Sequence, residues 1–194
     1  MQLKRITVFS GSSPGVESIY ASEAFHLGEK LAERGIELVY GGANVGLMGA
    51  VADGVLENGG QVIGVLPHHL KEKEIAHDRL TQLILVETMH ERKKRMDELS
   101  DAVIALPGGY GTLEELFEML TWAQLGLHKK PIGLLNINGF YNSLIELLSK
   151  MVGEGFLKSA NVDMLLVSED INELLEKIIN YNPADKAVEK WIGK

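Results

Sequence analysis

The sequence contains no cysteine, which excludes disulfide bonds, thiolate metal sites and a cysteine nucleophile. It has no apolar stretch long enough to cross a bilayer, and its first residues lack the apolar core of a secretory signal. Basic residues are also scarce: 27 acidic side chains against 19 basic ones give a net charge of −8. This balance argues against general binding to nucleic acid or to an anionic membrane. We therefore expect a cytoplasmic protein that binds neither.

Short apolar segments alternate with amphipathic ones along the 194 residues, as expected of one well-packed domain over residues 1–194. Such alternation predicts parallel strands covered by helices on both faces. The expected fold class is α/β, with a Rossmann-like, doubly wound, mainly parallel sheet. Residues 67–82 are the one long stretch without clear periodicity. The predicted strands lie at residues 6–9, 36–40, 61–66, 83–86, 102–106, 132–135 and 164–167.

Three loops rich in glycine or serine directly follow predicted strands, at residues 10–15, 41–46 and 107–112. In doubly wound sheets, ligands bind beyond the carboxyl ends of the strands, where the strand order reverses. We therefore expect the three loops to gather at one sheet edge around a nucleotide-sized pocket.

The loop at 107–112 carries the strongest signal of a phosphate site. Its glycines precede a helix that Thr112 is expected to open, and a helix N-terminus attracts anions. Gly108, Gly109 and Gly111 allow the main chain to approach a phosphate closely. The loop matches neither a P-loop nor a dinucleotide fingerprint, so we expect it to hold a single phosphate. The alternative is a tight strand-to-helix turn without a ligand.

The loop at 10–15 contains the pattern G-x-S-x-G of a nucleophile elbow, but its chemistry is wrong for a hydrolase of that kind. The residue after the central serine should supply an oxyanion-hole N–H, and Pro14 has none. We expect Ser10, Ser12 or Ser13 to line the ligand pocket with hydroxyl groups instead.

Arg92 stands out within the charged segment 89–95. The other charges of this predicted helix have partners at i,i+4, including Lys93 with Asp97 and Lys94 with Glu98. Arg92 has Met96 at that position, so it is the charge available to enter the pocket.

Glu115 has two interpretations that the sequence leaves open. Thr112-x-x-Glu115 is a capping box, in which the glutamate bonds the N-terminal amide of its own helix. Alternatively, Glu115 is a catalytic carboxylate beside the glycine loop.

These segments together resemble the LONELY GUY family. The stretch 107–115 matches that family's PGGxGTxxE signature, and the segments 41–49 and 89–93 are also similar to it. The resemblance implies hydrolysis of the N-glycosidic bond of an adenosine monophosphate to a free base and ribose 5-phosphate, without a cofactor or a metal ion. It also implies a catalytic pair of Arg92 and Glu115, and a homodimer. The expected phosphate- and nucleotide-binding residues are Ser10, Ser12, Gly42, Met89, Gly108, Gly109, Gly111 and Thr112.

Two other functions are alternatives to this hydrolysis. An older label of the family is possible lysine decarboxylase, but no lysine lies beside the three loops to form a Schiff base. A non-catalytic nucleotide-binding or carrier module would keep the glycine loops without needing both Arg92 and Glu115. The histidines at 68, 69 and 77 have no metal-ligand spacing and are expected to be exposed loop residues. Trp122, on an unusually apolar helix, is compatible with a dimer interface.

Overall fold

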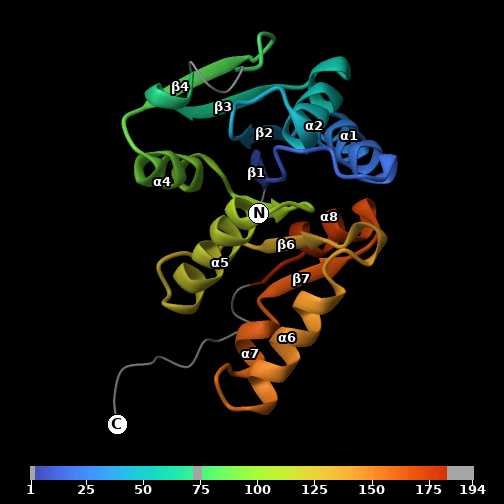
Figure 1. The fold of residues 1–194 in the computed structure, drawn as a ribbon, viewed down its shortest axis with the longest axis vertical. Helices are drawn as coiled ribbons and strands as arrows, with labels where there is room; N and C mark the ends of the chain where they lie inside the picture. Colours follow the sequence, from blue (N-terminus) through green and yellow to red (C-terminus); the bar gives the residue numbers. More distant parts are fainter. Residues whose placement is uncertain (1–2, 72–75, 183–194) are drawn as a thin grey trace.

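The structure is a computed structural model that describes residues 3–71 and 76–182, so the ends of the predicted domain lie outside the described residues. Its centre is a seven-stranded sheet, parallel throughout, in the order β4-β3-β2-β1-β5-β6-β7 (Figure 1). Every strand lies within one residue of its predicted bounds. The strands are β1 (Arg5–Phe9), β2 (Glu37–Tyr40), β3 (Val62–Pro67), β4 (Gln82–Val86), β5 (Ala102–Ala105), β6 (Ile132–Leu135) and β7 (Leu165–Ser168).

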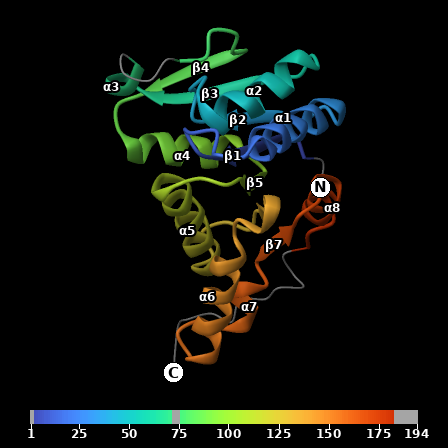
Figure 2. The ribbon, with the colours of Figure 1, turned by 45° about the vertical axis from the view of Figure 1, so that its right-hand side comes forward.

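Helices cover both faces of the sheet, which confirms the predicted doubly wound α/β class. One face packs against α1 (Ser18–Glu33), α2 (Gly46–Glu57) and α8 (Ile171–Ile179). The other packs against α4 (Met89–Leu99), α5 (Tyr110–Gln124) and α6 (Asn142–Gly153), with the short α7 (Ser159–Val162) beside α6. Alternate strand residues serve the two cores, because successive side chains of a strand point to opposite faces. Figure 2 shows β4 near one end of the molecule and α6 and α7 near the other.

The strand order reverses at β1. The chain runs outward from β1 through β2 and β3 to β4, then returns to place β5 on the other side of β1. This reversal is the position at which a doubly wound sheet opens a crevice. The three predicted loops follow β1, β2 and β5, so they meet at this point, as the sequence predicts.

Three local predictions were wrong. Helix α5 begins at Tyr110, two residues before Thr112, with Gly109 as its N-cap. The predicted irregular stretch contains the short helix α3 (His68–Lys71) and an antiparallel bridge between Ala76 and Ala43. His77 in this stretch is buried, contrary to the expectation of an exposed loop histidine.

The remaining segments connect these elements. A short 3-10 helix, η1 (Ile137–Gly139), follows β6. Within the described residues, no helix combines the length and the apolar character needed to cross a membrane.

Candidate active site

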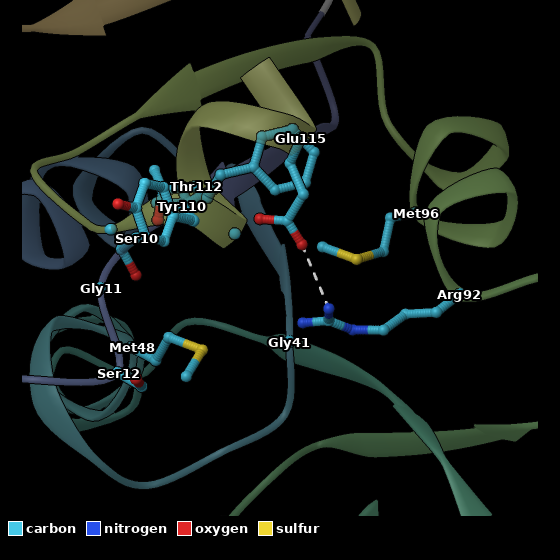
Figure 3. A pocket seen from close by; sticks show the side chains of 14 residues that line it. Ser10, Gly11, Ser12, Gly41, Met48, Arg92, Met96, Tyr110, Thr112 and Glu115 are labelled. Atoms are coloured by element: carbon cyan, nitrogen blue, oxygen red, sulfur yellow. Dashed lines mark hydrogen bonds and ion pairs between the residues drawn. The ribbon is translucent and has the colours of Figure 1, made fainter. Parts of the chain in front are cut away.

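A cavity of about 260 Å³ opens at the carboxyl ends of β1, β2 and β5 (Figure 3). It lies at the point where the strand order reverses. Its walls come from all three glycine-rich loops and from α2, α4 and α5. The lining residues are Val8, Phe9, Ser10, Gly11, Ser12, Gly41, Met48, Arg92, Met96, Gly109, Tyr110, Gly111, Thr112 and Glu115.

The loop after β1 packs directly on the loop after β5. The Gly11 N–H donates to the Pro107 carbonyl oxygen at 3.0 Å, and a Cβ on Gly11 would lie 3.2 Å from the Gly108 Cα. A Cβ on Gly108 would lie 2.1 Å from the Thr112 hydroxyl oxygen. These contacts leave no room for side chains, so the glycines hold the two loops together.

Helix α2 is fixed to the same loop. The Leu47 N–H donates to the Gly11 carbonyl oxygen at 3.0 Å. Gly46 adopts a φ of 58° and would bring a Cβ within 2.3 Å of the Ser12 backbone. A larger residue would separate α2 from the loop that lines the cavity.

The N-terminus of α5 offers hydrogen-bond donors to the cavity. Among the described residues, no side chain caps this helix. Gly109 and Gly111 line the cavity, and a Cβ on either would meet open space. The side of each glycine where a Cβ would stand is therefore open to a ligand. Backbone N–H groups and the positive end of the helix dipole suit an anion at this position.

Two hydroxyl groups reinforce this polar corner. Thr112, in the first turn of α5, is 4% exposed and lines the cavity. Ser10 is also buried, and within the described part of the chain its hydroxyl has no hydrogen-bond partner. A buried polar atom without a partner is costly, so the position of Ser10 on the cavity wall suits a ligand that bonds it.

Arg92 extends from the first turns of α4 into the cavity, as the helix spacing predicts. Its Nε–H donates to the Val65 carbonyl oxygen at 3.1 Å, and Nη1 donates to Oε1 of Glu115 at 3.1 Å. The guanidinium also lies against Gly41, where a Cβ would be 2.2 Å from Nη2. Three separate elements therefore fix the position of this charge.

Glu115 points toward Arg92 from α5 (Figure 3). Since the N-cap of α5 is Gly109, the side chain makes no capping box and pairs with Arg92 instead. Burial raises the pKa of Glu115 from its ordinary 4.5 to about 7, although the Arg92 charge acts in the opposite direction. A carboxyl that titrates near neutral pH in a cleft is typical of catalytic sites.

The sequence pattern predicts that Lys93 pairs with Asp97 of its own helix. In the structure it pairs instead with two glutamates of α5. Its ammonium group lies 2.5 Å from Glu114 and 2.9 Å from Glu118, and the side chain is 9% exposed. Burial alone would lower the pKa of Lys93, but the hydrogen bonds that its ammonium group donates to the two glutamates raise it above its ordinary value. Lys93 is thus held as a cation that joins α4 to α5, which does not suit Schiff-base chemistry.

Three residues predicted to bind the nucleotide lie outside the cavity wall. Gly42 has a φ of 87° and forms the turn behind Gly41. Gly108 supports Thr112, and Met89 is partly exposed at the start of α4.

The sequence reasoning missed several residues that line the cavity. Met96 carried a usable signal, because it lies four residues after Arg92 on the same helix face. Gly11, Gly41 and Tyr110 lie in the three loops expected at the pocket, whereas the positions of Val8, Phe9 and Met48 depend on contacts between distant segments. These missed residues are Val8, Phe9, Gly11, Gly41, Met48, Met96 and Tyr110.

Residues 48–178 match the family described as possible lysine decarboxylase. A probable cytokinin riboside 5'-monophosphate phosphoribohydrolase of Oryza sativa subsp. japonica is 47% identical over 96% of this chain and 77% of its own length. A cytokinin riboside 5'-monophosphate phosphoribohydrolase of Arabidopsis thaliana is 46% identical over 96% of this chain and 87% of its own. The chain belongs to this family, the LONELY GUY family. The resemblance stated from the motifs is thereby confirmed.

Solved structures share the fold. The molybdenum cofactor binding protein of Rippkaea orientalis has a TM-score of 0.68 and 25% identity, covering 92% of this chain and 97% of its own. The molybdenum cofactor carrier protein of Chlamydomonas reinhardtii has a TM-score of 0.67 and 22% identity, covering 91% and 96%. At this identity, the second likeness shows a common architecture alone.

Proposed function

We propose that this protein hydrolyses the N-glycosidic bond of adenosine 5'-monophosphate or of its N6-substituted, cytokinin-type derivatives. Water adds to C1' of the ribose while the C1'–N9 bond breaks, and the base leaves with a proton. The products are the free base and ribose 5-phosphate. The observation that carries the proposal is the buried Arg92–Glu115 pair, which shares one cavity with the N-terminus of α5. The activity named for the plant relatives supports it.

The 5'-phosphate would bind at the N-terminus of α5. Gly109 and Gly111 leave space there, and Thr112, Ser10 and Ser12 can donate hydroxyl hydrogen bonds. Gly108, in contact with Thr112, would support this site from behind, and roles for Gly42 and Met89 in nucleotide binding stay predictions. Holding the phosphate at a distance from the reacting bond uses binding energy to orient the ribose.

Glu115 would act on the ribose. Cleavage of an N-glycosidic bond builds positive, oxocarbenium-like charge at C1', as in glycoside hydrolysis. A carboxylate fixed beside this carbon stabilises that charge and can orient the attacking water. Because burial keeps water away from Glu115, the interaction is stronger than it would be in solution.

Arg92 would orient Glu115 and serve the leaving base. Its guanidinium holds one carboxylate oxygen and keeps further N–H donors on the cavity side. A donor placed at a ring nitrogen of the adenine stabilises the negative charge that the base acquires as the bond breaks.

The direct test is chromatography of the products after incubation with AMP and with N6-isopentenyl-AMP. The wild-type protein should release free base, and Glu115→Gln should lower kcat at least about 100-fold while calorimetry still detects nucleotide binding. Glu114→Gln is the matched control. This neighbouring glutamate lies outside the cavity, and Lys93 keeps Glu118 as a partner, so kcat should stay within about threefold of wild type.

Other results would decide against the proposal. If neither nucleotide releases base while both bind, the protein is a non-catalytic binding or carrier module. If Glu115→Gln loses binding and stability together with turnover, Glu115 is structural.

We also propose that two copies associate, and that the protein acts in the cytoplasm. Leu125 and Leu127, just after α5, are 61% and 70% exposed, and Trp122 is only partly buried beside them. Exposed apolar side chains that cluster in this way suit a subunit contact. Light scattering on the purified protein should give twice the mass of one chain, and a single-chain mass would contradict the dimer.

A further inference from the structure

His77 is a buried titratable residue that does not line the catalytic cavity. Its side chain is only 4% exposed. It belongs to the segment 76–79, which lies between β3 and β4 and contacts both α2 and the loop after β2. A buried imidazole needs hydrogen-bond partners, and those of His77 indicate what it does.

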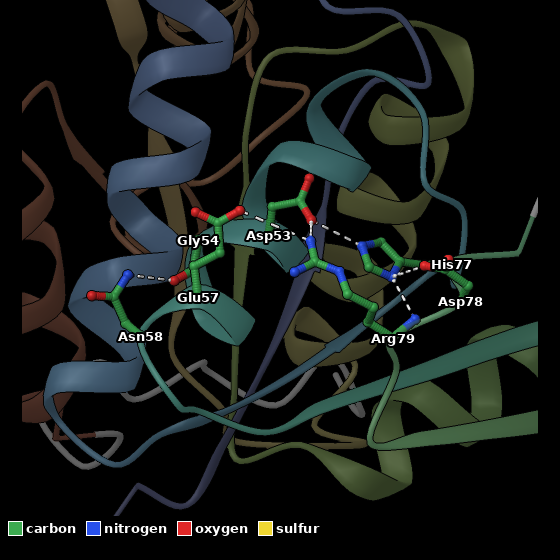
Figure 4. A network of polar contacts seen from close by, with 7 residues as sticks. All are labelled: Asp53, Gly54, Glu57, Asn58, His77, Asp78 and Arg79. Carbon is green, nitrogen blue, oxygen red and sulfur yellow. Dashed lines mark hydrogen bonds and ion pairs between the residues drawn. The ribbon is translucent and has the colours of Figure 1, made fainter.

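The imidazole ring joins this segment to α2 (Figure 4). Nδ1 accepts the Arg79 backbone N–H at 3.2 Å, and Nε2 lies 3.1 Å from Oδ1 of Asp53. Because Nδ1 is an acceptor, the ring proton sits on Nε2 and is donated to Asp53. The Arg79 guanidinium reaches the same carboxylate from the exposed side.

The backbone of this segment holds the turn that follows β2. The His77 N–H donates to the Gly42 carbonyl oxygen at 2.9 Å, and Ala76 bridges Ala43. Gly42, with its φ of 87°, adopts a conformation that favours glycine. The turn 41–43 therefore rests on a neighbouring segment that His77, from its buried position, and Arg79, from the surface, tie to Asp53 of α2.

The turn 41–43 is also one wall of the guanidinium site. A Cβ on Gly41 would lie 2.2 Å from Nη2 of Arg92, so backbone and guanidinium are in direct contact. On its other sides the guanidinium bonds Val65 and Glu115. Movement of the turn would leave Arg92 without this wall and allow it to rotate away from Glu115.

We infer that His77 is a positioning residue for the hydrolysis proposed above, on which this inference rests. Through Asp53 it keeps the turn 41–43 against the guanidinium. The turn then keeps Arg92 opposite Glu115. His77 itself touches neither the reacting atoms nor the phosphate site.

The test compares three variants of the full chain. His77→Leu removes both imidazole hydrogen bonds, His77→Gln keeps a donor for Asp53, and Arg79→Met removes only the exposed cation. With AMP as substrate, His77→Leu should lower kcat about 10- to 100-fold and leave KM within about threefold, because the phosphate loop is untouched. His77→Gln should recover part of the loss, and Arg79→Met should stay within about twofold of wild type.

A crystal structure of His77→Leu supplies a measurement that needs no catalysis. The distance from Nη1 of Arg92 to Oε1 of Glu115, 3.1 Å in the wild type, should exceed about 4 Å, the limit of an ion pair. Hydrogen exchange over residues 41–46 should also become faster. If His77→Leu does not fold, the same measurements on His77→Gln should show smaller changes in the same direction.

Several results would overturn the inference. These are an unchanged kcat, an unchanged distance between Arg92 and Glu115, or an equal loss of kcat in Arg79→Met. If the wild type releases no base at all, the proposed hydrolysis fails. The crystal distance and the exchange rates then still decide whether His77 positions Arg92.

Discussion

Substituting glutamine for Glu115 removes one titratable group from the cavity wall and keeps the shape of the side chain. Burial raises the pKa of Glu115 from its ordinary 4.5 to about 7 in the folded protein. In the unfolded chain the carboxyl is in water and keeps its ordinary pKa. At a pH between these two pKa values, Glu115 is protonated in the folded state and ionised in the unfolded state. This proton stabilises the fold at low pH, and its contribution is lost as the pH rises through about 7.

The size of the effect follows from the two pKa values. One pKa unit corresponds to about 1.4 kcal/mol, so the full titration changes the free energy of unfolding by about 3 kcal/mol. Between about pH 5 and about pH 8 the change is about 2.5 kcal/mol, because part of the titration lies below this interval. Glutamine does not titrate. The stability of Glu115→Gln relative to wild type should therefore rise by about 2.5 kcal/mol over this interval, or about 5–10 °C in Tm.

Urea unfolding at about pH 5 and about pH 8, at one protein concentration, measures this difference. All other titratable groups are common to both proteins and cancel. Arg92 stays charged at both pH values, so losing its partner shifts the stability of the variant equally at each. Glu114→Gln is the control, because the charge of this exposed neighbour only adds to the rise in the Glu115 pKa that burial causes, so most of the pH dependence should remain. If wild type and Glu115→Gln respond equally to pH, burial does not destabilise the Glu115 carboxylate and the reasoning fails.

Three further predictions concern activity and stability. First, if the carboxylate of Glu115 is the active form, kcat/KM for AMP should rise with pH around an inflection near pH 7. Initial rates at low substrate concentration measure this, and a falling limb at that pH would make Glu115 a general acid instead. Second, Gly41→Ala should place a methyl group in the space of the Arg92 guanidinium and lower kcat about 100-fold. Its Tm should change by only a few degrees, and wild-type rates would contradict the close contact. Third, Tyr141→Phe removes a buried hydroxyl that donates to the Leu106 carbonyl oxygen at 2.6 Å. The free energy of unfolding in urea should fall by about 1–2 kcal/mol, and no loss would mean that water replaces the bond.

The sequence was sufficient for the fold because the signals of this fold are local. Buried parallel strands are short apolar runs, and β1 and β2 are followed directly by Ser10 and Gly41, which start loops. The order of strands and helices then leaves few topologies, since parallel strands need crossover helices with a fixed hand. Because threonine is a common N-cap, the sequence predicts that α5 starts at Thr112. In the structure Gly109 is the N-cap, and α5 begins at Tyr110.

For the charged side chains of the site, the sequence offers only the spacing of residues within one helix as a guide. The apolar i,i+4 neighbour of Arg92 predicts that its charge is free to enter the pocket, and the structure places it in the cavity. The same reasoning failed for Lys93, whose partners Glu114 and Glu118 come from another helix. The sequence predicts that the 41–46 loop and Arg92 both reach the pocket, but it does not predict that the guanidinium lies against Gly41. Contacts between different helices and strands can be identified only from the folded structure.

The electrostatics of Glu115 connect these features to the proposed reaction. In the unliganded protein its charge is costly, since burial outweighs the attraction of Arg92. A ribose that becomes positively charged at C1' would supply the counter-charge that this carboxylate lacks. The interaction would therefore be stronger in the transition state than in the substrate complex, which is the condition for lowering the barrier. A carboxylate already well stabilised by solvent or by a second cation would gain less. The burial that destabilises the fold near neutral pH is thus the property that the reaction requires.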